Sequence, residues 1–75
     1  MAYLKDKKLL KNTAYLLKQL REEKELTQAD VFNDIKIHIG RIETAKSDIQ
    51  LSTLSVLCKY YDISLSDFFV KVENL

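Results

Sequence analysis

The sequence predicts an all-α fold, a compact bundle of about five short helices. Three observations favour this prediction. The chain of 75 residues contains no proline and one glycine, so its composition permits helices throughout. Apolar residues recur at helical spacing, and residues that cap helices stand where several apolar runs begin. A chain of this length supports one hydrophobic core, so we expect a single domain over residues 1–75.

The first helix is predicted from about Leu4 to Lys24. Its apolar stripe follows a spacing of three and four residues, in Leu10, Thr13, Leu17 and Leu20. Residues 1–15 are either the N-terminal part of this long helix or a basic arm.

A capping motif predicts the start of a second helix. Thr27 is a good N-cap, and Asp30 stands at the third helical position, which is close to a capping box. Asn33-Asp34 is a candidate for the end of this helix, because both residue types tolerate turn geometry. Three apolar side chains are expected to turn inward: Val31, Phe32 and Ile35.

Residues 35–39 allow two interpretations. Their alternation of isoleucine with lysine and histidine fits a strand bounded by Asn33-Asp34 and Gly40. At helical period, Ile35, Ile39 and Ile42 share one face. We favour a third helix, because a lone strand needs a partner and the only candidate, residues 70–72, is short.

Two more helices are predicted in the C-terminal part of the chain. The fourth ends at Asp62, and its apolar face is formed by Leu51, Leu54, Leu57, Cys58 and Tyr61. Ser64 is the predicted N-cap of the fifth, with Asp67 at the third helical position. This helix continues through Leu65, Phe68 and Phe69.

Charge is distributed unevenly, although the net charge is only +1. From Met1 to Arg21 there are six basic side chains and one acidic one, and from Glu22 to Asp34 there are five acidic and one basic. Residues 35–59 are again basic. This distribution allows one positive face, and the alternative is that the first helix is merely well solvated.

Several classes of function are disfavoured. One cysteine cannot form an internal disulfide, one histidine gives no zinc-ligand spacing, and we expect Cys58 to pack as a small apolar residue. No cysteine, histidine or carboxylate set has the spacing of a catalytic or metal site, so we expect neither an enzyme nor a cofactor. There is no signal peptide and no apolar run that could span a membrane, so the cytoplasm is the expected compartment.

The most informative stretch is the middle of the chain, where a helix, a short connection and a helix follow one another, as in many DNA-binding proteins. Five short motifs occur there and after it in a fixed order: Leu20–Lys24, Leu26–Gln28, Ile39–Glu43, Leu51–Leu54 and Ile63–Phe68. Together they resemble the helix-turn-helix domain of the lambda-repressor/Cro type, the XRE group of transcriptional regulators. The resemblance implies a compact five-helix fold with its helix-turn-helix unit at residues 27–46.

The resemblance also implies a set of site residues. Gln28 would bind a phosphate and brace the recognition helix, while Arg21 and Glu43 would form a structural salt bridge from the first helix to the third. Lys36 and Lys46 would contact phosphates at the two ends of the third helix. The remaining residues expected to face DNA in the major groove are Ile37, His38, Gly40, Arg41 and Thr44.

Three departures from the family pattern concern the turn. The interval from Gln28 to Glu43 is about three residues shorter than usual, close to one helical turn. Phe32 stands where the family usually has a small residue. Lys36 replaces the turn glycine and must avoid or tolerate a left-handed backbone.

The leading hypothesis is sequence-specific binding of double-stranded DNA by a transcriptional regulator, either a repressor or an antitoxin. A homodimer is expected, because so small a module gains affinity from a symmetric partner. Candidate dimer surfaces are the segment Phe68–Val70 and the exposed part of the first helix, with Tyr3 and Tyr15. The alternative is a module on the same fold that binds a protein, such as a toxin, and has lost DNA binding.

Overall fold

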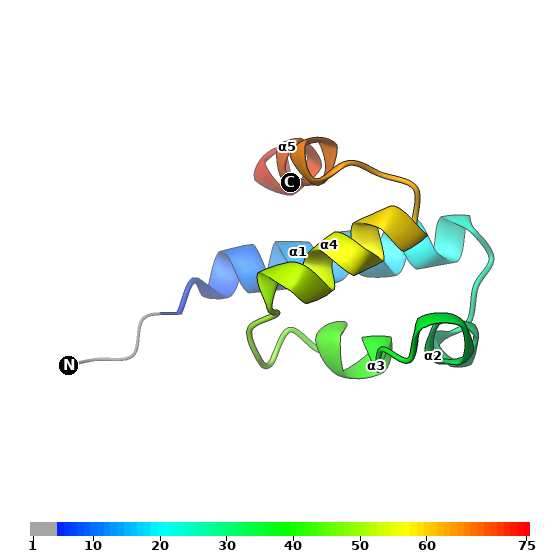
Figure 1. Ribbon diagram of the computed structural model, residues 1–75. Coiled ribbons are helices and arrows are strands. Elements are labelled where there is room, and N and C mark those ends of the chain that lie inside the picture. Colours follow the sequence, from blue (N-terminus) through cyan, green and yellow to red (C-terminus); the bar gives the residue numbers. More distant parts are fainter. Residues whose placement is uncertain (1–4) are drawn as a thin grey trace.

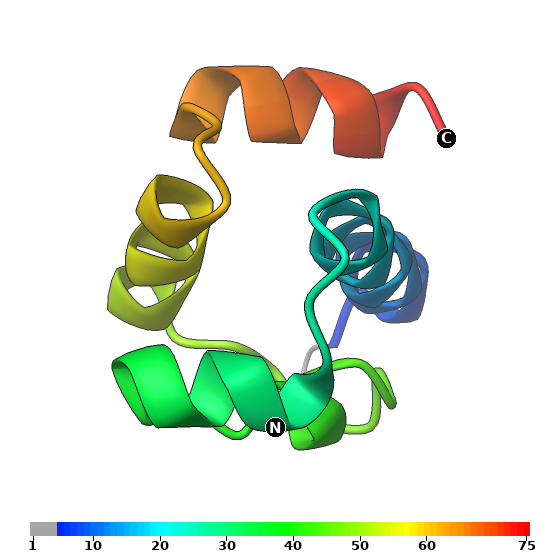
Figure 2. The same cartoon turned by 90° about the vertical axis from the view of Figure 1, so that its right-hand side faces the viewer.

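The computed structural model describes residues 5–75, and this part of the chain contains five helices and no strand. They are α1 (Lys7–Glu23), α2 (Gln28–Ile35), α3 (Ile39–Ile42), α4 (Leu51–Tyr60) and α5 (Leu65–Glu73). Figure 1 shows α2 and α3 on one side of the α1–α4 layer and α5 on the other. In the view of Figure 2, α4 and α1 face each other across the core, with α5 above and α2–α3 below. The predicted all-α fold is confirmed.

The first helix begins later than predicted. Asp6 is its N-cap, and the Asp6 carboxylate accepts a hydrogen bond of 2.9 Å from the backbone N–H of Leu9. Because a capping residue has extended backbone, the helix begins at Lys7. Leu4, where we expected it to begin, and Tyr3 lie outside the described residues.

The start of α2 forms as predicted. Thr27 Oγ1 accepts a hydrogen bond of 3.0 Å from Asp30 N–H, and the Asp30 carboxylate accepts one of 2.8 Å from Thr27 N–H. These bonds lower the pKa of Asp30. The end differs, because the helix continues through Asn33-Asp34 to Ile35 and stops at Lys36, which is left-handed with φ 59°.

The expected long third helix is not present. Residues 36–38 are not helical, and α3 has one turn, from Ile39 to Ile42. Left-handed Lys36 reverses the chain, and a tight hydrogen bond of 3.0 Å from Ile39 N–H to Ile37 C=O follows it. The isoleucines still pack on the core, Ile39 fully and the others partly, from two helices and the turn between them. Neither the strand nor the continuous helix was therefore right.

The core lies between all five helices. Its fully buried side chains include Leu17 of α1, Val31 of α2, Ile39 of α3, Leu57 of α4 and Phe68 of α5. Cys58 is buried as expected, and burial raises the pKa of its thiol. Tyr61 is also buried, and its hydroxyl has no hydrogen-bond partner within the part of the chain that the structure describes.

Two side chains predicted to face the core do not. Leu51 is 69% exposed, because it stands in the first turn of α4 at the rim of the core. Phe32 is half-buried, because its ring stacks against a surface histidine. The other end of the chain follows the prediction: Asp62 is left-handed after α4, and Ser64 Oγ accepts a hydrogen bond of 3.1 Å from Asp67 N–H at the start of α5.

Candidate nucleic-acid interface

A group of three side chains, which we call the Glu43 cluster, joins α1, α2 and the end of α3. Arg21 of α1 donates from Nε to Glu43 Oε2 at 2.7 Å and from Nη2 to Glu43 Oε1 at 3.0 Å. Gln28, the first residue of α2, donates from Nε2 to the same Oε1 at 3.0 Å. One carboxylate thus receives three hydrogen bonds from two helices, which fixes where α3 lies relative to α1 and α2.

Arg21 has a third contact, a hydrogen bond of 2.8 Å from Nη1 to the backbone C=O of Leu26. The guanidinium therefore also holds the connection between α1 and α2. Its side chain is 10% exposed and that of Glu43 is 5% exposed. The hydrogen bond to Glu43 raises the pKa of Arg21, against the lowering effect of burial.

Gly40 is explained by the side chain of Gln28. A Cβ at position 40 would lie 2.8 Å from Gln28 Oε1, closer than a Cβ approaches a non-bonded atom, so the amide of Gln28 would have to move. The backbone of Gly40 does not have positive φ, so neither a turn nor strain requires glycine there. Glycine lets the amide of Gln28 lie directly over α3 while it bonds to Glu43.

A second surface group lies at the turn between α2 and α3. The rings of Phe32 and His38 are stacked, with centroids 4.4 Å apart and an interplanar angle of 27°. Lys36 Nζ lies 5.4 Å from the centroid of the Phe32 ring, and it donates a hydrogen bond of 3.3 Å to Asn33 C=O. Sequence reasoning placed Phe32 in the core and missed this group. The available signal was the large ring at a position where the family usually has a small residue.

The remaining predicted site residues are distributed around α3. Arg41 on α3 and Thr44 and Lys46 after it are exposed, and Thr44 Oγ1 donates to Arg41 C=O at 2.6 Å. Ile37 is half-buried against the core instead of standing out at the surface. The exposed members of the predicted DNA-binding set are therefore Gln28, Lys36, His38, Arg41, Thr44 and Lys46.

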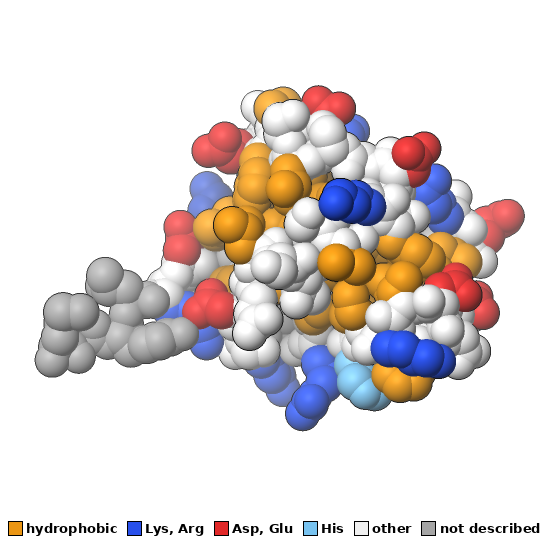
Figure 3. All heavy atoms as spheres, in the orientation of Figure 1, with side chains coloured by type: hydrophobic (Ala, Val, Ile, Leu, Met, Phe, Trp, Pro, Cys, Tyr) orange, Lys and Arg blue, Asp and Glu red, His pale blue; other side chains and the backbone are white. Residues whose placement is uncertain are grey.

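We expected Lys36 at the start of the third helix, but it does not lie there. It is the C-cap of α2, and His38 takes the N-cap position of α3. Charge is nevertheless concentrated where α3 lies. In Figure 3, basic side chains gather along the lower edge of the molecule, from the N-terminal part of α1 to the α2–α3 region, while acidic ones lie on its other borders.

A family model described as helix-turn-helix matches residues 17–68, more than half of the chain. The chain belongs to the lambda-repressor/XRE-type helix-turn-helix family. The match covers α2, α3 and α4 together with parts of α1 and α5, and it confirms the resemblance. A search of curated proteins found no match, and neither did a search of solved structures.

Helix-turn-helix proteins of this family are DNA-binding transcription regulators, and that general function applies to this chain. The segment expected to form the helix-turn-helix unit, residues 27–46, contains α2, the turn at residues 36–38 and the single turn of α3. Among residues 5–75, no group of histidine, cysteine and carboxylate side chains could hold a metal ion. None of the helices in this part of the chain is long and apolar enough to cross a membrane.

Proposed function

We propose that this helix-turn-helix protein is a sequence-specific regulator of transcription, a repressor or an antitoxin, whose α3 enters the major groove of double-stranded DNA. The observation that carries the proposal is the Glu43 cluster, which holds α2 and α3 rigidly while their polar and basic side chains stay exposed. Preorganised side chains bind at a lower entropic cost than mobile ones.

Each exposed residue has a role that its chemistry fits. Arg41 can donate two parallel hydrogen bonds to guanine, and Thr44 can contact a base or a phosphate. Lys36 and Lys46 stand on either side of α3 and suit phosphates. Gln28 at the start of α2 lies where free backbone N–H groups also favour a phosphate. His38, supported by the Phe32 ring, can bond to a base edge.

A homodimer completes the proposal, with one copy bound to each half-site. Phe68 is buried and is not available for the dimer interface. The exposed apolar side chains of α1 and the C-terminal segment include Tyr15, Val70 and Leu75. All three line a hollow of about 380 Å³ between α1 and α5. This hollow is the dimer surface that we favour.

The test compares Arg41→Ala and Gln28→Ala with Lys8→Ala, a control that removes an exposed basic side chain of α1 that belongs neither to the predicted DNA-binding set nor to the lining of the favoured dimer surface. Duplexes selected by the parent from a random pool supply the ligand. Arg41→Ala should weaken binding about 5- to 150-fold, the loss of one good base contact, and relax the preference at one position. Gln28→Ala should weaken binding to all duplexes, and Lys8→Ala should change little. If Arg41→Ala and Gln28→Ala bind the selected duplexes as tightly as the parent does, the proposed site is refuted.

A second function is favoured by one specific observation, the exposure of large apolar side chains such as Leu51, Val56 and Leu9. These residues suit a protein partner, such as a toxin. The dependence of affinity on salt concentration distinguishes the two functions. Affinity for DNA falls steeply as the salt concentration rises, because DNA binding releases counterions, whereas the affinity of an apolar protein contact is much less sensitive.

A further inference from the structure

A hollow of about 530 Å³ lies between the start of α1 and the loop that follows α3. Lysine supplies most of its lining, in Lys5, Lys7, Lys11 and Lys46, and the rest comes from Leu10, Thr44 and Ala45. None of these described lining residues carries a carboxylate. The ammonium groups of Lys7, Lys11 and Lys46 repel one another around this hollow, and an anion placed among them reduces that repulsion.

The hollow is built by regular local structure. Lys7 and Lys11 are separated by one turn of α1 and therefore project from the same face. Opposite them, Ala45 is left-handed with φ 61°, which turns the loop toward α1. Lys5 Nζ donates a hydrogen bond of 3.1 Å to the backbone C=O of Lys46 and ties the two sides together.

The hollow adjoins the proposed DNA surface. Thr44 and Lys46 line it and also belong to the set of residues around α3. A duplex that accommodates α3 in its major groove has its phosphate ridges on either side of that helix, about 12 Å apart across the groove. In Figure 3 the basic edge continues from α3 toward the N-terminal part of α1, where an acidic group lies beside it.

We propose that this hollow is a second phosphate-binding site, in which Lys7, Lys11 and Lys46 hold the DNA backbone beyond the base pairs that α3 contacts. The inference rests on the proposed function, since it needs a duplex seated on α3. It assigns the lysines of α1 to affinity, and it assigns Arg41 of α3 with its neighbours His38 and Thr44 to sequence preference.

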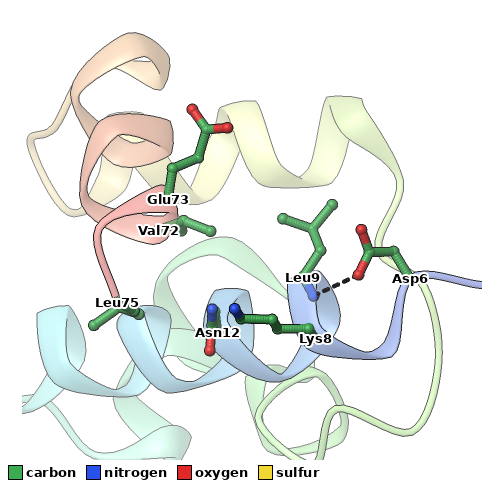
Figure 4. Close-up of a pocket in the computed structure, with 7 residues that line it drawn as sticks. All are labelled: Asp6, Lys8, Leu9, Asn12, Val72, Glu73 and Leu75. Carbon is green, nitrogen blue, oxygen red and sulfur yellow. Dashed lines mark hydrogen bonds between the residues drawn. The ribbon is translucent and has the colours of Figure 1, made fainter.

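The test uses the double variant Lys7→Gln/Lys11→Gln and the single variants Lys7→Gln and Lys8→Gln. Lys8 is the matched control, because it lies in the same turn of α1 but faces another hollow, beside Asn12 and Glu73 at the end of α5 (Figure 4). All these lysines are exposed, so the helical circular-dichroism signal should not change. Two duplexes carry the same selected site: one ends at the site, and the other extends by about one helical turn on each side.

The parent should bind the longer duplex more tightly, with a steeper dependence of affinity on salt. The double variant should lose this advantage: its slope of log affinity against log salt falls by about 2, since each lost phosphate contact contributes about 0.9. Lys7→Gln should lower the slope by about half as much, and Lys8→Gln should behave as the parent does. The order of preference among sequences should stay the same in every lysine variant.

Three results would overturn the inference. The double variant could keep the full advantage on the longer duplex, or Lys8→Gln could lose as much as Lys7→Gln, which would indicate a general charge effect. The parent could instead bind vesicles of anionic phospholipid, and the lysine variants could lose vesicle binding while their duplex binding stays equal to that of the parent. That result would assign the hollow to a membrane surface. If the proposed function itself is wrong, Arg41→Ala should leave DNA binding and sequence preference unchanged. That result would refute the further inference as well, and it differs from the three results above.

Discussion

At the scale of single residues, Glu43 is the side chain on which the geometry of the site depends. Its carboxylate is almost buried and receives hydrogen bonds from Arg21 and Gln28. A buried ion pair contributes little net stability compared with apolar residues of the same size, but the loss of one partner leaves the other charge without compensation. The pair therefore determines position more than stability.

Arg21→Ala should lower the free energy of unfolding by about 3–5 kcal/mol, because Glu43 would remain buried without a cation. A small domain has only about 5–15 kcal/mol in total, so the melting temperature should fall sharply. The double variant Arg21→Met/Glu43→Leu should recover most of the loss, since neither side chain is charged. Urea unfolding of the parent and both variants measures these differences, and an unchanged stability for Arg21→Ala would contradict them.

Residues that act locally were predictable, and those that act across helices were not. Thr27 with Asp30 and Ser64 with Asp67 follow capping rules that span four residues, and both caps form. The proximity of Gln28 and Gly40 depends on how α2 crosses α3. No spacing rule in one sequence contains that angle, so the reason for the glycine became visible only in three dimensions.

At the scale of elements, the turns are notable because almost no glycine is available. Four described residues that are not glycine have positive φ: Glu25, Lys36, Ala45 and Asp62. Each stands just after a helix or its last turn. Sequence patterns locate a turn mainly through glycine and proline, which explains why residues 36–38 looked like part of a longer helix or a strand.

Lys36→Gly should stabilise the protein by about 0.5–1 kcal/mol. A left-handed residue with a Cβ costs about 1–2 kcal/mol, and the greater freedom of glycine in the unfolded chain cancels part of the gain. Lys59→Gly in α4 is the control and should destabilise by about 1 kcal/mol, because its backbone is helical. Thermal unfolding measures both. On the proposed function Lys36→Gly should also bind DNA more weakly, so that stability and affinity change in opposite directions.

At the scale of the whole molecule, one hydrogen bond links helices that are far apart in sequence. Tyr60 at the end of α4 donates from its hydroxyl to Asp34 Oδ2 of α2 at 2.5 Å. The bond, with burial and the negative charge of Asp34, raises the pKa of Tyr60 to about 12. This link holds the end of α2 against α4, while the Glu43 cluster holds the start of α2.

The pH dependence of stability follows from that pKa. The value in the folded protein, about 12, lies above the ordinary value of 10.0, so folding favours the protonated phenol. The contribution is fully present below pH 10 and is lost as the pH rises through about 12. Tyr60→Phe and Asp34→Asn should each make urea stability fall less steeply between pH 10 and 12 than it does in the parent. Parallel curves for parent and variants would show that the bond does not matter. Tyr61 also has a raised pKa because of burial, so the parent curve contains both residues.

The fold as a whole was predictable because helical spacing is a property of each segment and the motifs occur in a known order. The position of the basic surface was only partly predictable. The sequence shows a basic N-terminal segment, but it does not show that Lys7 and Lys11 lie opposite Lys46. That juxtaposition depends on Ala45, whose left-handed backbone nothing in the sequence indicated.

Because α3 is short, its side chains can contact only a few base pairs. Four residues of helix are about 6 Å long, which is the length of about two base pairs along the duplex axis. The two copies of α3 in a dimer would together read about four base pairs. A given sequence of about four base pairs recurs roughly every 250 base pairs, whereas a genome offers about 10⁶ or more competing positions. On the proposed docking, the base contacts of His38, Arg41 and Thr44 must therefore be supplemented by bases that no side chain touches, through the stiffness and groove width of the DNA between the two copies of α3.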